Sequence, residues 1–361
     1  MPKPSLRSIA HAMGVSPSTV SRALRNSPRI SESRKRQVRE MLAVYGYPLD
    51  PAAGERTDER ERSAVAFLIA NPQGNLNSDS FFTEVIRGAV RFLNEAGRSL
   101  LVDTLAEGEG DLTRQLESLL ASQRVSALVV GGIPLPDRCV ETLANASVPA
   151  VFIGKYTQNP FRFNAVLPDN VEGGRLVGLH LTACGYEEFY YFGGDLHIHT
   201  FSDRLNGYQQ GLKESGARLP AENVLISPRI DQAAGYRLAK MLLSRLTPGV
   251  PGQNPARRAI FAATDWMAAG VLRALAEEGR AVPEEFGVVG YSDLELASHI
   301  IPALTTVRVN MDQLGYLAAR TAVDLASLTL AGPIQIVQQP VLAIRESSAQ
   351  SQGTGNVQAG A

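Results

Sequence analysis

Short apolar runs alternate with amphipathic stretches along most of this chain, and this alternation limits the possible folds more than any other feature. The apolar runs, each of strand length, are residues 64–70, 99–105, 126–131, 149–154, 188–193, 223–227, 259–263 and 286–290. The amphipathic stretches with helical spacing are residues 82–96, 111–123, 171–184, 204–215, 233–246 and 266–278. Strands that alternate with helices form parallel sheets covered by helices on both faces. The chain therefore predicts an α/β fold, and two halves, about 64–155 and 160–288, fit it better than one very wide sheet.

The first fifty residues differ from the rest of the chain in charge. They contain nine Lys and Arg against three Asp and Glu, whereas the whole chain has a formal net charge of −1. A positive segment on an acidic body suits a polyanion such as nucleic acid, because the neutralisation of phosphates supplies most sequence-independent affinity. A solvated charged face is the alternative that charge alone leaves open.

Residues 5–25 contain two short helical patterns joined by a tight turn. Ala10 is small enough for two helices to approach each other, and Gly14 can adopt the positive φ that a three-residue turn needs. Ser16 is a good N-cap and Pro17 a good first residue for the second helix. This is the spacing of a helix-turn-helix, whose second helix enters the major groove of DNA. An ordinary helical hairpin is the alternative.

The second helix of this motif supplies the expected DNA contacts. The residues expected to face base edges are Pro17, Ser18 and Arg22, and those expected to bond phosphates are Ser16, Thr19 and Ser21. Arg22 can donate two hydrogen bonds to a guanine. A third helix, capped by Ser31 and with Val38, Met41, Leu42 and Tyr45 on one side, completes a three-helix core.

These residues resemble a known DNA-binding headpiece. The matching positions are Leu6, Ile9, Ala10, Gly14, Val15, Ser16, Ser18, Thr19, Val20, Ser21, Arg22 and Leu24, followed by Ile30-Ser31-Glu32 and Gly46-Tyr47. The pattern is similar to the headpiece of the lactose-repressor (LacI/GalR) family of bacterial transcription regulators. The resemblance implies a homodimer on a near-palindromic operator in double-stranded DNA. A single small reading helix also needs a second copy for adequate specificity.

Residues 48–62 are polar and without helical apolar spacing, so they predict a linker between a headpiece of residues 1–47 and a body of residues 63–346. In the family this linker folds into a hinge helix on DNA, and a leucine enters the minor groove. This chain has Arg56 at the leucine position, so we expect an electrostatic contact with the minor groove and weak or absent kinking of the DNA. Residues 347–361, rich in Ser, Gln and Gly, are expected to form a disordered tail.

The resemblance covers roughly residues 5–346 and implies a body similar to periplasmic sugar-binding proteins, with two lobes joined by three crossovers. The expected lobes are residues 63–157 with 291–320, and residues 158–290 with 321–346. An effector would bind between them, beyond the carboxyl ends of the strands.

Residues just after the predicted strands match the family's effector-binding positions. The matching side chains are Asp169, Arg204, Asp265 and Asp293, with Phe82 and Trp266, beside Phe81, as candidate rings for the apolar face of a sugar. Each has a structural alternative: Asp265 as a helix N-cap, Arg204 paired with Asp203 or Asp195 on the surface, and the rings as packing residues. Where the family often has two successive acids, this chain has Ser292 before Asp293.

Other functional classes find little support in the sequence. No stretch reaches the ~18 apolar residues of a membrane span, and the first residues lack the apolar core of a secretory signal, so a cytoplasmic location is expected. Cys139 and Cys184 lie far apart, which argues against a disulfide framework or a structural zinc site. His197-x-His199 resembles half of a metal-hydrolase signature but lacks further ligands. No nucleophile elbow, P-loop or dinucleotide fingerprint is present.

The sequence therefore predicts a protein that is not an enzyme and uses no cofactor or metal. We expect a DNA-binding transcription regulator, acting as a repressor, whose operator affinity is controlled by a small-molecule effector such as a sugar or sugar derivative. A solute-binding transport component and a metal-dependent hydrolase are the alternatives from other classes.

Overall fold

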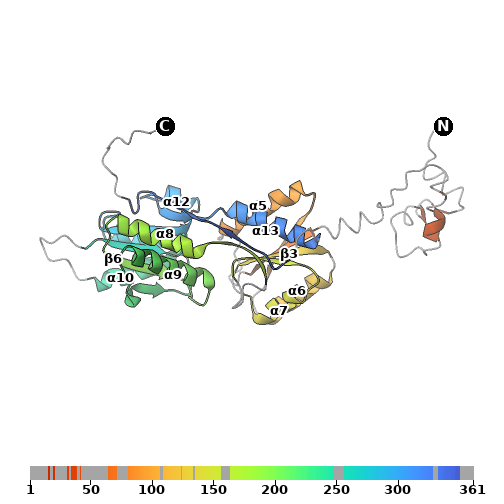
Figure 1. Ribbon diagram of the computed structural model, residues 1–361, viewed down its shortest axis with the longest axis horizontal. Helices are drawn as coiled ribbons and strands as arrows, with labels where there is room; N and C mark the ends of the chain where they lie inside the picture. Colours follow the sequence, from red (N-terminus) through yellow and green to blue (C-terminus); the bar gives the residue numbers. More distant parts are fainter. Residues whose placement is uncertain are drawn as a thin grey trace, which may run out of the picture.

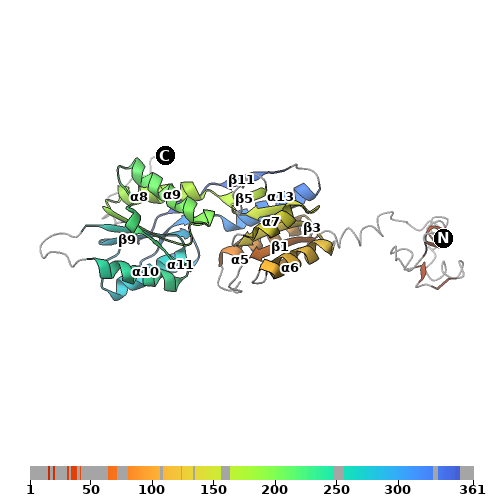
Figure 2. The same ribbon diagram turned by 90° about the horizontal axis from the view of Figure 1, so that it is seen from below.

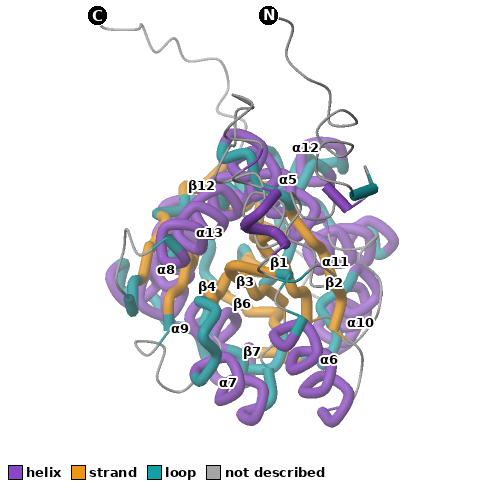
Figure 3. Tube along the Cα trace, turned by 90° about the vertical axis from the view of Figure 1, so that its right-hand side faces the viewer, coloured by secondary structure: helices purple, strands orange, loops and turns teal. Residues whose placement is uncertain are grey.

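The computed structural model describes residues 15–16, 19–20, 31, 34–38, 41, 64–70, 80–105, 109–122, 124–132, 135–155, 163–246, 256–327 and 332–349, and every structural statement below concerns these residues. From Ala64 onward they form two lobes placed end to end along the long axis of the molecule (Figures 1 and 2). Each lobe contains one six-stranded sheet. Seen along the long axis, the strands occupy the centre and the helices surround them (Figure 3).

Lobe 1 contains the sheet with strand order β11-β5-β4-β3-β1-β2, in which all paired strands are parallel. Its strands are β1 (Ala64–Ala70), β2 (Leu100–Leu105), β3 (Val125–Gly132), β4 (Ala150–Ile153), β5 (Asn164–Pro168) and β11 (Gln335–Gln338). Its helices are α5 (Ser80–Glu95), α6 (Glu109–Ala121), α7 (Asp137–Ala144) and α13 (Met311–Ala326).

Lobe 2 contains the sheet with strand order β12-β10-β9-β8-β6-β7, in which only the short β12 is antiparallel to its neighbour among the described strands. Its strands are β6 (Glu188–Gly193), β7 (Val224–Ile226), β8 (Arg258–Ala262), β9 (Phe286–Ser292), β10 (Thr305–Arg308) and β12 (Val341–Ala343). Its helices are α8 (Asn170–Ala183), α9 (His199–Glu214), α10 (Gln232–Arg245), α11 (Asp265–Glu277) and α12 (Leu296–His299), with a 3₁₀ turn at Ala221–Asn223.

The predicted α/β class with mainly parallel sheets is confirmed. Central strands are mostly buried, and β9 is buried along its whole length, because helices cover both faces of each sheet. Phe67 of β1 and Phe261 of β8 are fully buried at the centres of the two lobes. Near-continuous apolar runs such as Ala64–Ala70 are what such doubly covered strands require.

The crossovers between the lobes show which ends of the strands in one sheet face the other lobe. The chain leaves lobe 1 at the carboxyl end of β5 and enters lobe 2 at α8; it returns from the carboxyl end of β10 to α13. A third crossover joins β11 to β12. Both sheets therefore direct the carboxyl ends of their parallel strands toward the other lobe, which is where ligands of open α/β sheets bind.

The expected lobe boundaries are wrong in two places. Residues 291–308 lie in lobe 2, because β10 pairs with β9; α13 through Ala326, together with β11, lies in lobe 1. The first crossover comes after β5 rather than near residue 157, because β5 adds to lobe 1 beside β4 before the chain leaves it. β5 and α7 were missing from the expected elements: β5 has only five residues and ends in proline.

The expected tail begins too early. Ser347 and Ser348 are fully buried. The Ser347 hydroxyl donates to the Val288 carbonyl at 2.6 Å, and its backbone oxygen accepts from the Val288 N–H at 2.8 Å. The Ser348 hydroxyl bonds that of Thr305 at 2.8 Å. A small polar side chain can thus bind β-strand backbone in the core, which composition does not reveal; residues 350–361 lie outside the described residues.

Helices α5 and α13 of lobe 1 pack so closely that glycine is required at the contact. A Cβ at Gly315 would overlap the carbonyl oxygen of Val85, and a Cβ at Gly88 would overlap that of Asp312. We therefore expect Gly315→Ala to lower the free energy of unfolding by about 2 kcal/mol, because backbone cannot yield as a flexible side chain does. Urea denaturation measures this loss. Arg320→Ala, on an exposed side of the same helix, should change it by less than about 0.5 kcal/mol; equal effects of the two would contradict the close-packing argument.

Candidate functional site

The described part of the headpiece contains two of the predicted DNA-contacting residues. The Ser16 side chain accepts a hydrogen bond from the Thr19 N–H at 3.1 Å, and the two hydroxyls lie 2.8 Å apart. This is the geometry of an N-cap at the start of a helix. Val20 is fully buried, as a corner-closing residue requires. The other predicted contacts, Pro17, Ser18, Ser21, Arg22 and Arg56, lie outside the described residues.

Four of the predicted effector-binding residues, Asp169, Arg204, Asp265 and Asp293, lie at the end of lobe 2 that faces lobe 1. They lie at or near the ends of α8, α9, α11 and β9. Asp169 is the N-cap of α8 and accepts from the Glu172 N–H at 3.0 Å. Its second oxygen accepts from the Gln339 amide at 3.2 Å, which connects the first crossover to the third. Gln338 in turn donates to the Asn310 carbonyl, at the start of α13, at 3.2 Å. The glutamine pair therefore links all three crossovers, a role that the sequence analysis missed.

Arg204 is a buried arginine in the second turn of α9. Its Nε donates to Asn170 Oδ1 at 3.0 Å, and a terminal nitrogen donates to the Ala263 carbonyl at 2.5 Å. The guanidinium lies over the ring of Tyr291, 3.6 Å from its centroid. Burial lowers the pKa of Arg204, while burial also raises the pKa of Tyr291 to about 12. The surface-pairing alternative is therefore wrong: Arg204 joins α8, β8 and β9 beneath the surface.

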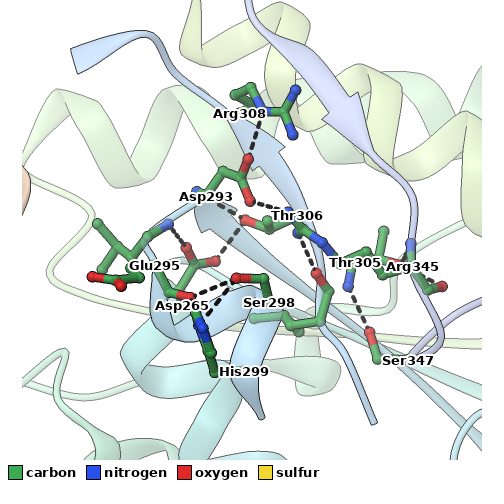
Figure 4. A network of polar contacts seen from close by, with 12 residues as sticks. Asp265, Asp293, Glu295, Ser298, His299, Thr305, Thr306, Arg308, Arg345 and Ser347 are labelled. Carbon is green, nitrogen blue, oxygen red and sulfur yellow. Dashed lines mark hydrogen bonds and ion pairs between the residues drawn. The ribbon is translucent and has the colours of Figure 1, made fainter. Parts of the chain in front are cut away.

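Asp265, at the start of α11, is fully buried and belongs to a network of polar contacts (Figure 4). Its two oxygens accept from the Thr306 hydroxyl at 2.6 Å and from the Leu294 N–H at 2.7 Å. Burial raises its pKa to about 6, and these two hydrogen bonds oppose that rise. The N-cap alternative is wrong, because the Thr264 side chain caps α11 by accepting from the Met267 N–H.

Asp293 follows β9 and is held by two arginines (Figure 4). It accepts from Arg308 Nε at 2.5 Å and from an Arg345 terminal nitrogen at 2.7 Å. Ser292 and Asp293 both have positive φ, 116° and 56°. Such backbone is uncommon outside glycine and often marks functional positions. This backbone conformation turns the Asp293 side chain toward Arg308 of β10 and toward Arg345, which follows β12.

The aromatic candidates separate into a core residue and a surface residue. Phe82 is buried and packs edge to face against Phe81 and Phe67, with ring centroids 5.2 and 6.4 Å away. Trp266 is 40% exposed in the first turn of α11, directly after Asp265. The packing alternative thus describes Phe82 in this structure, whereas Trp266 presents its ring to solvent.

Signals for the metal-hydrolase alternative do not converge in the described residues. No group of three or more His, Cys, Asp and Glu side chains there could hold a metal ion. His199 begins α9 and His197 lies in the preceding turn, so the two are not neighbours on one strand. Within the same residues, no helix is long and apolar enough to cross a membrane.

Two family profiles match the chain. Residues 5–48 match the bacterial regulatory proteins of the lacI family, and residues 179–348 match the periplasmic binding protein-like domain. Among curated proteins, the HTH-type transcriptional regulator CelR of Thermobifida fusca is 28% identical over 347 residues, covering 96% of this chain and 98% of that protein. The HTH-type transcriptional repressor PurR of Klebsiella pneumoniae strain 342 is 26% identical over 321 residues, covering 89% of each chain.

Solved structures with a similar fold cover nearly the whole chain. A complex of the transcriptional regulator CelR with cellobiose has a TM-score of 0.72 at 27% identity and covers 96% of this chain and 100% of that chain. A lac repressor dimer bound to operator and the anti-inducer ONPF has a TM-score of 0.71 at 24% identity, covering 97% and 100%, which is a likeness of fold.

Proposed function

The chain belongs to the LacI/GalR family of bacterial transcription regulators, and on that premise we propose that it binds operator DNA under the control of a small molecule bound between its lobes. One observation carries the proposal: a headpiece match at residues 5–48 precedes a two-lobed body whose sheets point their carboxyl ends at each other. A periplasmic-binding-protein-like body would also suit a transport component. The match of the headpiece to a DNA-binding family favours the regulator over the transport component. A DNA-binding regulator would be located in the cytoplasm, where DNA is accessible.

The proposed effector site is the lobe 2 surface at Asp169, Asp293 and Trp266, with Arg204 and Asp265 beneath it. Carboxylates suit the hydroxyls of a sugar, and an exposed indole suits its apolar face. The cellobiose complex of CelR supports a carbohydrate class. Asp265 is fully buried, so an effector that reaches it has to move Thr306 or Leu294, which contact its two oxygens. Binding at this site is thereby coupled to β10 and hence to the crossover into lobe 1.

We propose that the protein acts as a repressor and a homodimer. The edge strand β2 supports a dimer, because Leu101 and Val102 are 42% and 45% exposed there. An apolar edge strand left open is an aggregation hazard that a symmetric partner removes. An effector can shift operator affinity only by its differential affinity for the two lobe arrangements, typically about 1–3 kcal/mol.

The test of base reading is Arg22→Ala. We expect this substitution to weaken binding to the operator by about 1–3 kcal/mol, because a bidentate contact to guanine is lost. Binding to random DNA and the thermal stability of the body should change little. Fluorescence anisotropy with an operator selected in vitro by the intact protein measures both affinities at one salt concentration. Equal losses on operator and random DNA would remove Arg22 from the base-reading role.

The test of effector control is a thermal-shift screen against sugars, sugar phosphates and sugar acids, because a ligand that binds only the folded state raises the melting temperature. A compound that raises it should also change operator affinity. Stabilisation without any change in DNA binding would contradict the proposed control.

A further inference from the structure

Among the described residues, one ion pair spans the two lobes. Lys155 Nζ lies 2.6 Å from Asp203 Oδ2. Lys155 follows β4 in lobe 1, and Asp203 lies in the first turns of α9 in lobe 2. The other ion pairs between described residues, such as Arg175–Glu214 and Arg258–Glu188, lie within a single lobe. Lys155–Asp203 is therefore placed to respond to the distance between the lobes.

Local structure fixes both partners. Gly154 has a φ of 117°, and its N–H donates to the Val166 carbonyl at 3.3 Å, so the chain turns sharply at the carboxyl end of β4. This turn directs Lys155 toward lobe 2. Asp203 is held in α9 immediately before the buried Arg204, whose bonds to Asn170 and Ala263 anchor this end of the helix. The sequence neighbours of the pair thus belong to the framework of each lobe.

The environment makes the pair more than a surface contact. The side chains are 30% and 16% exposed, so water screens their attraction less than it screens a fully exposed pair. The pair exists only while the lobes lie this close, and a movement that opens them separates the two charges. Any free energy that the pair contributes therefore favours the closed arrangement alone, and this is the differential contribution that shifts a population.

We propose that Lys155 and Asp203 form a latch that holds the two lobes together. The latch rests on the proposed function only for its regulatory meaning: an effector must enter and leave between lobes that this pair holds together. Removing either charge should raise the ratio of open to closed protein about 2- to 5-fold, the effect of a partly exposed ion pair.

Distances between spin labels on the full chain test the latch. Labels at Glu141→Cys on α7 and Gln209→Cys on α9 report the two lobes, since both side chains are exposed. Cys184→Ser removes a partly exposed native thiol, and the buried Cys139 stays unlabelled. Double electron–electron resonance, without effector or DNA, then gives the populations of short and long distances. Lys155→Met and Asp203→Asn should each increase the long-distance population.

Two further variants decide whether the pair itself is responsible. The exchange Lys155→Asp with Asp203→Lys should restore a distribution near that of the original pair, whereas a merely structural role of either residue would make the double variant worse than both single ones. Lys240→Met breaks the Lys240–Glu278 pair within lobe 2 and should leave the distances unchanged. Unchanged distances in both single variants, or no recovery in the exchange, overturn the latch. Failure of the intact protein to bind DNA would overturn the proposed function and leave this result standing.

Discussion

Removal of residues 1–62 is expected to reduce operator affinity by about 10³-fold or more, while the two-lobed body stays folded. Specific complexes with DNA are typically 10³–10⁷-fold tighter than non-specific ones. In this chain the basic charge and the helix-turn-helix match both lie in the removed segment. The remaining chain is acidic overall and should be repelled by phosphate. The described residues from Ala64 onward contain their own core clusters and need no headpiece contact to form them.

The experiment compares intact and shortened protein on the same operator by gel mobility shift at constant salt, because affinity for DNA depends steeply on salt. Thermal unfolding of the shortened protein is the control for its fold. Effector-induced stabilisation should persist in it, since the proposed effector site contains no residue before 169. Undiminished operator binding by the shortened protein would locate DNA recognition in the lobes and end the proposal.

The sequence predicted most of the elements of this fold, for physical reasons that can be named. Strand β1 was expected at its observed residues, because a strand buried on both faces is apolar at every position. Helix α8 was expected within one residue at each end, since Asp169 caps it and Gly185 follows its end. Helix α9 begins five residues earlier than expected, because no capping side chain marks its start at Ile198.

The distribution of strands between the lobes was not predictable in the same way. Hydrophobic patterns report whether a segment is buried, not which sheet it joins. β9 and β10 are separated by α12 and the loop around it, yet they pair in lobe 2. The next helix, α13, packs on α5 of lobe 1. The return of the chain from lobe 2 to lobe 1 between β10 and α13 depends on long-range contacts, which neither periodicity nor spacing encodes.

The sequence predicted where the candidate residues lie relative to the strands, but not how deeply their side chains are buried. Asp169, Arg204, Asp265 and Asp293 were expected from their positions after strands, and the structure places them at one end of lobe 2. Their partners were missed, because the binding of Thr306 to Asp265 and the stacking of Arg204 on Tyr291 join segments far apart in the chain. Burial also raises the pKa of Asp265 to about 6, so the charge of this side chain changes near neutral pH.

Asp265→Asn is expected to change how stability depends on pH. Burial raises the pKa of Asp265 from its ordinary 3.8 to about 6, so the folded protein binds more protons than the unfolded chain between these values. The stability that Asp265 contributes is therefore fully present below pH 4 and is lost as pH rises through 6. The difference in unfolding free energy, original minus variant, should fall by about 2 kcal/mol between pH 4 and pH 7. The amide can still accept from the Leu294 N–H and can donate to the Thr306 oxygen, so the variant should fold.

Urea denaturation of both proteins across this pH range measures the difference, and Asp231→Asn is the matched control. Asp231 caps α10 on the surface; partial burial opposes its ionisation, but the Ala234 N–H and Arg229 outweigh this and lower its pKa. Its stabilisation is present above its unfolded pKa and is lost as pH falls, so the two variants should show opposite slopes. Asp265→Asn should also abolish the effector's influence on operator affinity, because the amide keeps only one acceptor oxygen, which the Leu294 N–H occupies, and carries no charge to attract ligand hydroxyls. A pH-independent difference would show that Asp265 is not held in the low-dielectric wall that couples the effector to β10.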